Sequence, residues 1–185
     1  MIRIKPQLLK KLSFFAVIVS LFCATLSVHL FAQTSEVPEN IAPIDAPFEM
    51  PPLDRPDFPD QTFDITEYGA QSMDQDKNFK NTDAIHKAIE AAHRNGGGRV
   101  LIPEGEWLTG PIHLKSHINL HLADGAVVHF SQDKQDYLPV VRYRHEGVET
   151  YNYSPLIYAY KVKNVAITGS GVLEAHGEHW WEWGK

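Results

Sequence analysis

The sequence predicts an all-β fold of the β-solenoid class, because strand-like segments recur with the same internal spacing. Turn-forming residues such as Pro103-Glu104-Gly105 separate the two halves of each segment. Coils of this kind cannot bury an apolar face alone and must stack on one another. The three copies are Val100-x-Ile102 with Trp107-Leu108, Leu120-x-Leu122 with Val127-Val128, and Val165-x-Ile167 with Val172-Leu173.

The spacing of the copies predicts one insertion within the solenoid. The first two copies lie 20 residues apart and the last two 45 residues apart. We therefore expect a long loop over Asp133–Ser154 between otherwise regular coils.

The N-terminus has the order of a secretory signal peptide. Arg3, Lys5, Lys10 and Lys11 precede an apolar run from Leu12 to Val28. Cleavage is expected after Ala32, which makes residues 1–32 the signal peptide and the mature protein exported, either periplasmic or secreted. The alternative is an uncleaved membrane anchor, since the run approaches the ~20 residues of a spanning helix.

Charge and cysteine content narrow the function classes. Cleavage would leave 13 basic against 23 acidic residues, a formal charge of −10, so no nucleic-acid interface is expected. The one cysteine, Cys23, lies in the apolar run, so the mature chain has no disulfide and must be stabilised by an extensive regular core.

A proline-rich acidic segment, residues 33–62, precedes the domain at 63–185. Seven prolines interleave with acids, which is typical of an extended spacer. The alternative is an ordered coil on the domain surface, anchored by Phe48, Leu53 and Phe58.

One amphipathic helix is expected before the strands. A short strand at Phe63–Ile65 comes first, and Asn81 can then cap a helix that ends at Gly96–Gly98. Its apolar face, with Ile85 and Ile89, would cover the open edge of the first coil as an N-terminal cap. No closing helix is expected after the last strand pair, so we expect the β-helix to be incomplete at its C-terminal end and to continue past Lys185.

From Phe63 to Trp183 the chain resembles family 28 glycoside hydrolases, the polygalacturonases and their relatives. The resemblance implies a right-handed parallel β-helix that hydrolyses α-linked galacturonic acid polymers with inversion. Pectic polysaccharide, polygalacturonate or rhamnogalacturonan, is then the expected partner, with no metal or organic cofactor and a monomeric protein. The stretches that carry it are Asp64–Ala70, Asn81–Ile85, Gly96–Val100, Ile102-Pro103, Leu108–Ile112, Leu114–Ser116, Asn119–Leu122, Ser154–Ile157 and Asn164–Gly171.

The resemblance implies catalytic carboxylates that this sequence does not contain. An inverting site needs an acid and a base about 6.5–9.5 Å apart. The family has them in an Asn-x-Asp segment and an Asp-Asp pair on later coils, so no catalytic residue is assigned here and these are expected beyond Lys185. Asn81-Thr82-Asp83 imitates the first motif at a helix start, and His176-Gly177 imitates a histidine motif in a turn.

The insertion carries the candidate substrate-binding residues Arg142, Arg144 and Tyr151. Arginine forks bind carboxylates and tyrosine rings stack on pyranoses. The alternative is that the arginines pair with Glu146 and Glu149 and only order the loop. The tryptophans Trp180, Trp181 and Trp183 are expected to pack beneath a following coil rather than to form a sugar platform.

Two other functions stay open. A β-helical pectate-lyase-type enzyme would use proton abstraction, although the Leu-Thr-Gly-Pro stretch argues against it. A noncatalytic polysaccharide-binding fragment is the other alternative for the chain as given. No metal site is expected, since His113, His117, His121 and His129 have irregular spacing.

Overall fold

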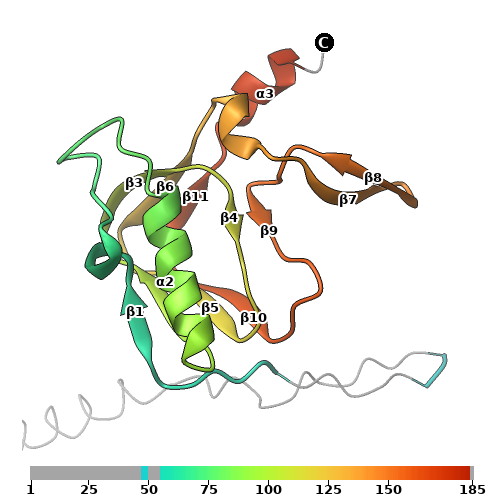
Figure 1. The fold of residues 1–185 in the computed structure, drawn as a ribbon, viewed down its shortest axis with the longest axis horizontal. Coiled ribbons are helices and arrows are strands. Elements are labelled where there is room, and N and C mark those ends of the chain that lie inside the picture. Colours follow the sequence, from blue (N-terminus) through green and yellow to red (C-terminus); the bar gives the residue numbers. More distant parts are fainter. Residues whose placement is uncertain (1–46, 50–54, 184–185) are drawn as a thin grey trace, which may run out of the picture. The chain divides into compact units, whose positions relative to one another are not determined.

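The computed structural model describes residues 47–49 and 55–183. Residues 56–183 form one compact unit (Figure 1). The predicted signal peptide and most of the predicted spacer lie outside the described residues. Within the described part, no helix is both long and apolar enough to cross a membrane.

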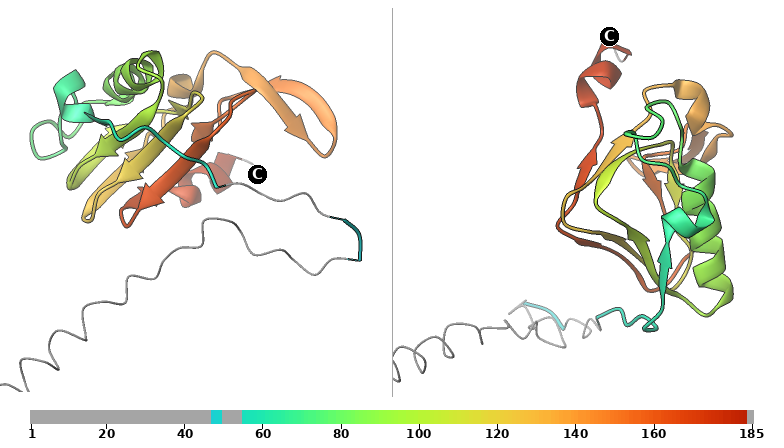
Figure 2. Two further views of the ribbon diagram at one scale, coloured as in Figure 1. Left: turned by 90° about the horizontal axis from the view of Figure 1, so that it is seen from below. Right: turned by 90° about the vertical axis from the view of Figure 1, so that its left-hand side faces the viewer.

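Three parallel sheets form the body of this unit. The strands of each sheet come from successive coils, so residues far apart in the sequence lie side by side (Figure 2). This arrangement is a parallel β-helix, as the repeats predict. The first sheet is β1 (Thr62–Asp64), β2 (Gly98–Ile102), β5 (Ile118–Leu122) and β10 (Val165–Gly169); the second is β3 (Gly105–Thr109), β6 (Ala126–Phe130) and β11 (Val172–Glu174); the third is β4 (Ile112–His113) and β9 (Ile157–Tyr158).

The core lies between the sheets, where inward side chains of neighbouring coils align. Val100 of β2 pairs in register with Leu120 of β5, and both are fully buried. Val128 of β6, also fully buried, aligns with Trp107 of β3. Because strand side chains alternate, each coil contributes every second residue to this continuous core.

The register of the third copy differs from the expected alignment. The sequence pattern aligns Val165 with Leu120, but Val165 pairs with Ile118, two residues away. It likewise aligns Trp107 with Val127, whereas Trp107 pairs with Val128. Apolar residues two apart have the same pattern, so residue type alone could not choose between the two registers of Val165. The shift at Trp107 is one residue and changes the face: Val128 is buried, whereas Val127 is partly exposed, and both are valines.

The corner between β10 and β11 is the tightest of the three and depends on glycine. Gly169 has φ of +99°, and a Cβ placed there would lie 1.8 Å from the carbonyl oxygen of Leu122. Gly171 is also crowded, although less than Gly169, since a Cβ would lie 2.7 Å from the carbonyl oxygen of Ala126. Only glycine allows the coils to approach this closely.

The amphipathic helix α2 (Thr82–Arg94) packs against the first coil. Its fully or nearly fully buried face includes Ile85, Ala88 and Ile89, as the sequence predicts. A 3-10 helix, η1 (Ile65–Tyr68), follows β1 and precedes α2, and its fully buried Ile65 belongs to the core. Burial of such aliphatic side chains stabilises the fold by roughly 1.5–3 kcal/mol each.

The capping prediction for Asn81 is wrong at the level of its side chain. Asn81 is the N-cap residue of α2, but its side chain makes no capping hydrogen bond. Instead its Oδ1 accepts from the N–H of Gln71, and its Nδ2 donates to the carbonyl oxygens of Gln71 and Leu108. The fully buried amide thus ties the preceding loop to β3.

The insertion is an ordered structure rather than a long loop. It contains the 3-10 helix η2 (Lys134–Tyr137) and an antiparallel hairpin of β7 (Val141–His145) and β8 (Val148–Asn152). A Glu146-Gly147 turn with positive φ at both residues joins the strands, as hairpin turns require.

A short helix, α3 (Gly177–Trp183), follows β11, which corrects the expectation that no helix closes the strand pairs. Trp180 on this helix packs edge-on against Tyr137 of η2, with ring centroids 5.4 Å apart. Helix α3 is short and aromatic, so its sequence lacks the apolar periodicity that identifies longer helices.

Candidate functional site

The sheet of β4 and β9 presents two aromatic side chains on its outer surface. His113 pairs in register with Tyr158, and the preceding residues Ile112 and Ile157 pair beside them. Ile112 is fully buried, so alternation directs His113 and Tyr158 outward. The hydrogen bond from Leu114 N–H to the carbonyl of Tyr158, at 2.8 Å, extends the pairing beyond the strands.

Four rings lie in succession, each close to the next, and we call them the aromatic row. It consists of His86 of α2, His113 of β4, Tyr158 of β9 and Tyr160 in the loop after β9. The centroids of successive rings lie 5.5, 5.2 and 6.3 Å apart. The row therefore crosses from the helix over the sheet to the adjacent loop.

Two cations flank the outer end of the row. The guanidinium of Arg142 lies 5.3 Å from the centroid of the Tyr160 ring, and Lys161 Nζ lies 5.5 Å from it. Arg142 Nη1 also donates to Tyr160 Oη at 2.5 Å, and Tyr158 Oη donates to the carbonyl oxygen of Arg142 at 2.9 Å. Both tyrosines thus hold the hairpin strand β7 beside the row.

The hairpin brings the three sequence-predicted binding residues onto one face. In the antiparallel register, Arg142 lies opposite Tyr151 and Arg144 lies opposite Glu149. Strand alternation places these four side chains together. Tyr151 is 71% exposed, and Arg142 forms an ion pair with Glu149. Their contact with a ligand stays a prediction.

The two histidines of the row are held in defined hydrogen bonds. His86 Nε2 accepts the backbone N–H of His113 at 3.1 Å. His113 Nε2 lies 2.9 Å from Ser154 Oγ, and because that hydroxyl donates to the carbonyl of Pro155, His113 Nε2 is the donor. Burial lowers the pKa of both histidines, and the nearby His113 lowers that of His86 further.

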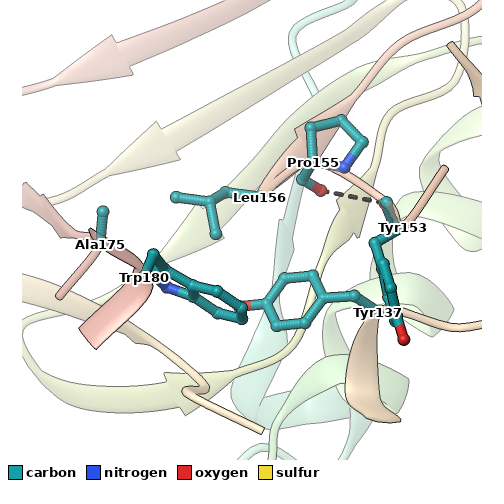
Figure 3. Close-up of a pocket in the computed structure, with 7 residues that line it drawn as sticks. Tyr137, Tyr153, Pro155, Leu156, Ala175 and Trp180 are labelled. Carbon is teal, nitrogen blue, oxygen red and sulfur yellow. Dashed lines mark hydrogen bonds between the residues drawn. The ribbon is translucent and has the colours of Figure 1, made fainter. Parts of the chain in front are cut away.

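An apolar hollow of about 320 Å³ lies beyond Ser154 (Figure 3). Tyr137, Leu156 and Trp180 line it together with Tyr153, Pro155 and Ala175. Tyr137 is buried and donates to the carbonyl of Ser131 at 2.6 Å, and burial raises the pKa of its hydroxyl. Trp180 packs edge-on against Tyr137 in this hollow, whereas Trp181 is 69% exposed.

The two segments that imitate catalytic motifs, Asn81-Thr82-Asp83 and His176-Gly177, lie at a helix start and in a turn. Asp83 lies in the first turn of α2. His176 lies in the turn between β11 and α3, where its Nε2 is 3.2 Å from His129 Nδ1 of the neighbouring coil. The first motif contains one carboxylate and the second contains none, so neither supplies a catalytic pair by itself.

Sequence reasoning missed most of the aromatic row. The alternation of Ile157, Tyr158, Ala159 and Tyr160 is a usable signal, because it places both tyrosines on one side of a strand. His86 and His113 carry no such signal, since their meeting depends on how α2 packs against β4.

Relatives found by sequence and by structure agree with the β-helix fold. No model of a known protein family matches the chain. A probable polygalacturonase from Vitis vinifera is 32% identical over 111 residues, which are 55% of this chain and 22% of that protein. The crystal structure of a hyperthermoactive exopolygalacturonase from Thermotoga maritima matches with a TM-score of 0.65 and 47% identity, over 72% of this chain and 30% of that chain. The family 28 exopolygalacturonase of Yersinia enterocolitica matches with a TM-score of 0.52 and 32% identity, over 62% of this chain and 20% of that chain.

Over part of its length, the chain is related to the family 28 glycoside hydrolases.

This relationship confirms the resemblance predicted from the motifs. The fold of family 28 enzymes is the right-handed parallel β-helix, and the three parallel sheets of this chain reproduce that architecture. The chain spans about a fifth to a third of the length of these relatives. The aromatic row is thus a surface feature of a parallel β-helix that is related over part of its length to these enzymes.

Proposed function

We propose that this chain is part of a pectin-degrading glycoside hydrolase of the polygalacturonase type, and that it binds an acidic pectic polysaccharide along the aromatic row. One observation carries this proposal: four successive rings run from α2 over the β4–β9 sheet to Tyr160, which lies beside two cations. Rings of this kind stack on pyranose faces, and cations attract uronate carboxylates.

The local charge supports an anionic partner. The whole chain has a formal charge of −6, yet the β9–β10 loop carries Lys161 and Lys163 and no acidic residue, and both Lys161 and Arg142 of the hairpin lie beside the Tyr160 ring. Among the described residues, no carboxylate lies within 4.0 Å of the charged nitrogens of Arg144, Lys161 or Lys163. A cationic area on an acidic protein concentrates a polyanion at that area.

Hydrolysis with inversion is proposed for the whole protein. That reaction needs two carboxylates separated by about 6.5–9.5 Å. We assign no catalytic residue to the described part of this chain and place the pair on further coils of the complete enzyme.

The β10–β11 edge supports a further coil. Ile167 aligns with the fully buried Leu120 but is 47% exposed, and Leu173 aligns with the fully buried Val128 but is 38% exposed. Another coil would cover both side chains. At the other edge, α2 covers the first coil, and we propose that it acts as the cap that prevents edge-to-edge association.

Export completes the proposal. We propose residues 1–32 as a cleaved signal peptide and 33–62 as a spacer before a monomeric domain at 63–185. The charge order before the apolar run of residues 12–28 supports it. Mass spectrometry of the N-terminus of the secreted protein tests it: retention of Met1 in the mature product would contradict cleavage.

Polysaccharide binding is tested with the full chain by isothermal titration calorimetry against galacturonate oligomers. An aromatic contact is worth about 0.5–1.5 kcal/mol, so Tyr160→Ala is expected to weaken binding by about two- to tenfold. Tyr143→Ala is the matched control, because Tyr143 lies on the opposite face of the hairpin. Equal losses in both variants, or equal binding of neutral galacto-oligomers, would contradict the proposed surface.

A second assay concerns the reaction. The chain is expected to release no reducing ends from polygalacturonate. Measurable hydrolysis would show that the catalytic carboxylates lie within it and would overturn our placement of them on further coils.

A further inference from the structure

The guanidinium of Arg142 has two partners at the outer end of the aromatic row. Nη1 donates to the hydroxyl of Tyr160, and Nη2 donates to the carboxylate of Glu149 across the hairpin. The guanidinium is therefore oriented by the tyrosine and occupied by a carboxylate. This is the arrangement that a uronate on the row would meet.

The Arg142–Glu149 pair is accessible to solvent. The side chain of Arg142 is 38% exposed and that of Glu149 is 61% exposed. Exposed ion pairs are worth only about 0.2–1 kcal/mol, so an incoming carboxylate can replace Glu149 at small cost. The hydrogen bond to Tyr160 keeps the guanidinium in place during the exchange.

The hairpin also supplies a second partner for the displaced carboxylate. Arg144 lies directly opposite Glu149 in the ladder and on the same face as Arg142. Directly opposite residues have Cβ atoms about 4.5–5.5 Å apart, which is within reach of an arginine side chain. Glu149 can therefore leave Arg142 without losing a cationic neighbour.

We propose that Glu149 occupies the position of a substrate carboxylate on Arg142, and that an unesterified uronate replaces it while its ring stacks on Tyr160 beside Lys161. This inference rests on the proposed function and adds the residues that select the free acid. A methyl ester lacks the negative charge that could replace Glu149, so it should not compete. Arg144 acts as a positioning residue that receives the displaced carboxylate.

The test measures binding of galacturonate hexamers, free and fully methyl-esterified, to the full chain. Glu149→Gln removes the internal competitor and should tighten binding of the free acid by about 1.5- to 5-fold. It should leave binding of the ester unchanged. Glu146→Gln is the matched control: it removes the same charge from the same hairpin, but from the turn next to His145 rather than from Arg142.

A second variant separates exchange from a structural role. Arg144→Gln should weaken binding of the free acid about two-fold in the wild-type background, because the displaced Glu149 then lacks a partner. The loss should be clearly smaller in the Glu149→Gln background, where no displaced carboxylate needs a partner. A merely structural Arg144 would cause the same loss in both.

The outcomes distinguish this inference from the proposed function. If the wild-type chain binds the hexamer but Glu149→Gln binds no tighter than Glu146→Gln, the exchange is wrong and the proposed function stands. If neither the wild type nor Glu149→Gln binds, both are wrong.

Discussion

The Nε2 atom of His86 accepts the backbone N–H of His113 at 3.1 Å, which joins helix α2 to strand β4. This bond exists only while Nε2 carries a lone pair, so it requires a neutral His86. Protonation would place two N–H donors face to face. The contact between the helix and the first coil therefore depends on pH.

Acid should destabilise the fold through His86. Burial, followed by the charge of His113, lowers its pKa below 6.5 in the folded chain, while Asp83 opposes the shift more weakly. The stabilisation is present above pH 6.5 and is lost as pH falls from 6.5 through the lowered folded pKa, because the unfolded chain takes up the proton first. Lys80, Asp83 and Asp136 line a second hollow beside His86 and His113, and Lys80 and Asp136 form an ion pair there at 2.5 Å.

Thermal unfolding at pH 7.5 and 5.0 checks this prediction. His86→Gln should show a smaller fall in Tm between the two pH values than the wild type. His145→Gln, on the exposed hairpin, should behave like the wild type. An unchanged pH dependence in His86→Gln would contradict the role of this bond.

Gly169→Ala should prevent the third coil from closing. Its Cβ would lie 1.8 Å from the carbonyl oxygen of Leu122, which is backbone and cannot move aside. Gly147→Ala is the control, because Gly147 has φ of +87° but no atom within 4 Å of a Cβ. It should cost only about 1–2 kcal/mol for the left-handed conformation. Urea unfolding should show a clearly larger loss for Gly169→Ala, and equal losses would argue against the close approach.

Leu120 and Ile167 occupy aligned positions with different burial. Leu120→Ala should lower the free energy of unfolding by about 2–5 kcal/mol, because Leu120 is fully buried. Ile167→Ala should cost less than about 1 kcal/mol, since Ile167 is 47% exposed. Chemical denaturation measures both; a large loss at Ile167 would show that another surface covers it.

Asn81→Ala should destabilise the chain by more than a lost helix cap. It leaves the N–H and carbonyl of Gln71 and the carbonyl of Leu108 without this partner, at about 1–3 kcal/mol for each group that stays buried and unpaired. Asn78→Ala, in the exposed preceding loop, should change stability by less than about 0.5 kcal/mol. A loss of about 1 kcal/mol or less for Asn81→Ala would instead fit an ordinary cap.

Local sequence patterns predicted the coils, the helix and its buried face. Val100, Leu120 and Val128 belong to short apolar segments with strand-like alternation. Ile85 and Ile89 lie four residues apart, as on one face of a helix. These periodicities arise within one element, so a single sequence contains them. The shift of Val165 to Ile118 was missed because a register two residues away satisfies the same alternation.

The candidate site was predicted only in part. Arg142, Arg144 and Tyr151 stand in one inserted segment, and their residue types fit the acidic sugar that the family resemblance implies. The link of Arg142 to Tyr160 joins positions 18 residues apart, and Asn81 bonds Leu108 across 27 residues. No local pattern encodes such pairs.

The sequence by itself determined the solenoid, its family resemblance and the chemical character of its inserted segment, because these follow from short-range periodicity and motifs. Only the tertiary structure decided which side chains meet: His86 with His113, Tyr158 with Arg142, and Glu149 with the guanidinium of Arg142. The physical reason is that a parallel β-helix brings residues from different coils into contact through register and packing, which depend on the whole chain.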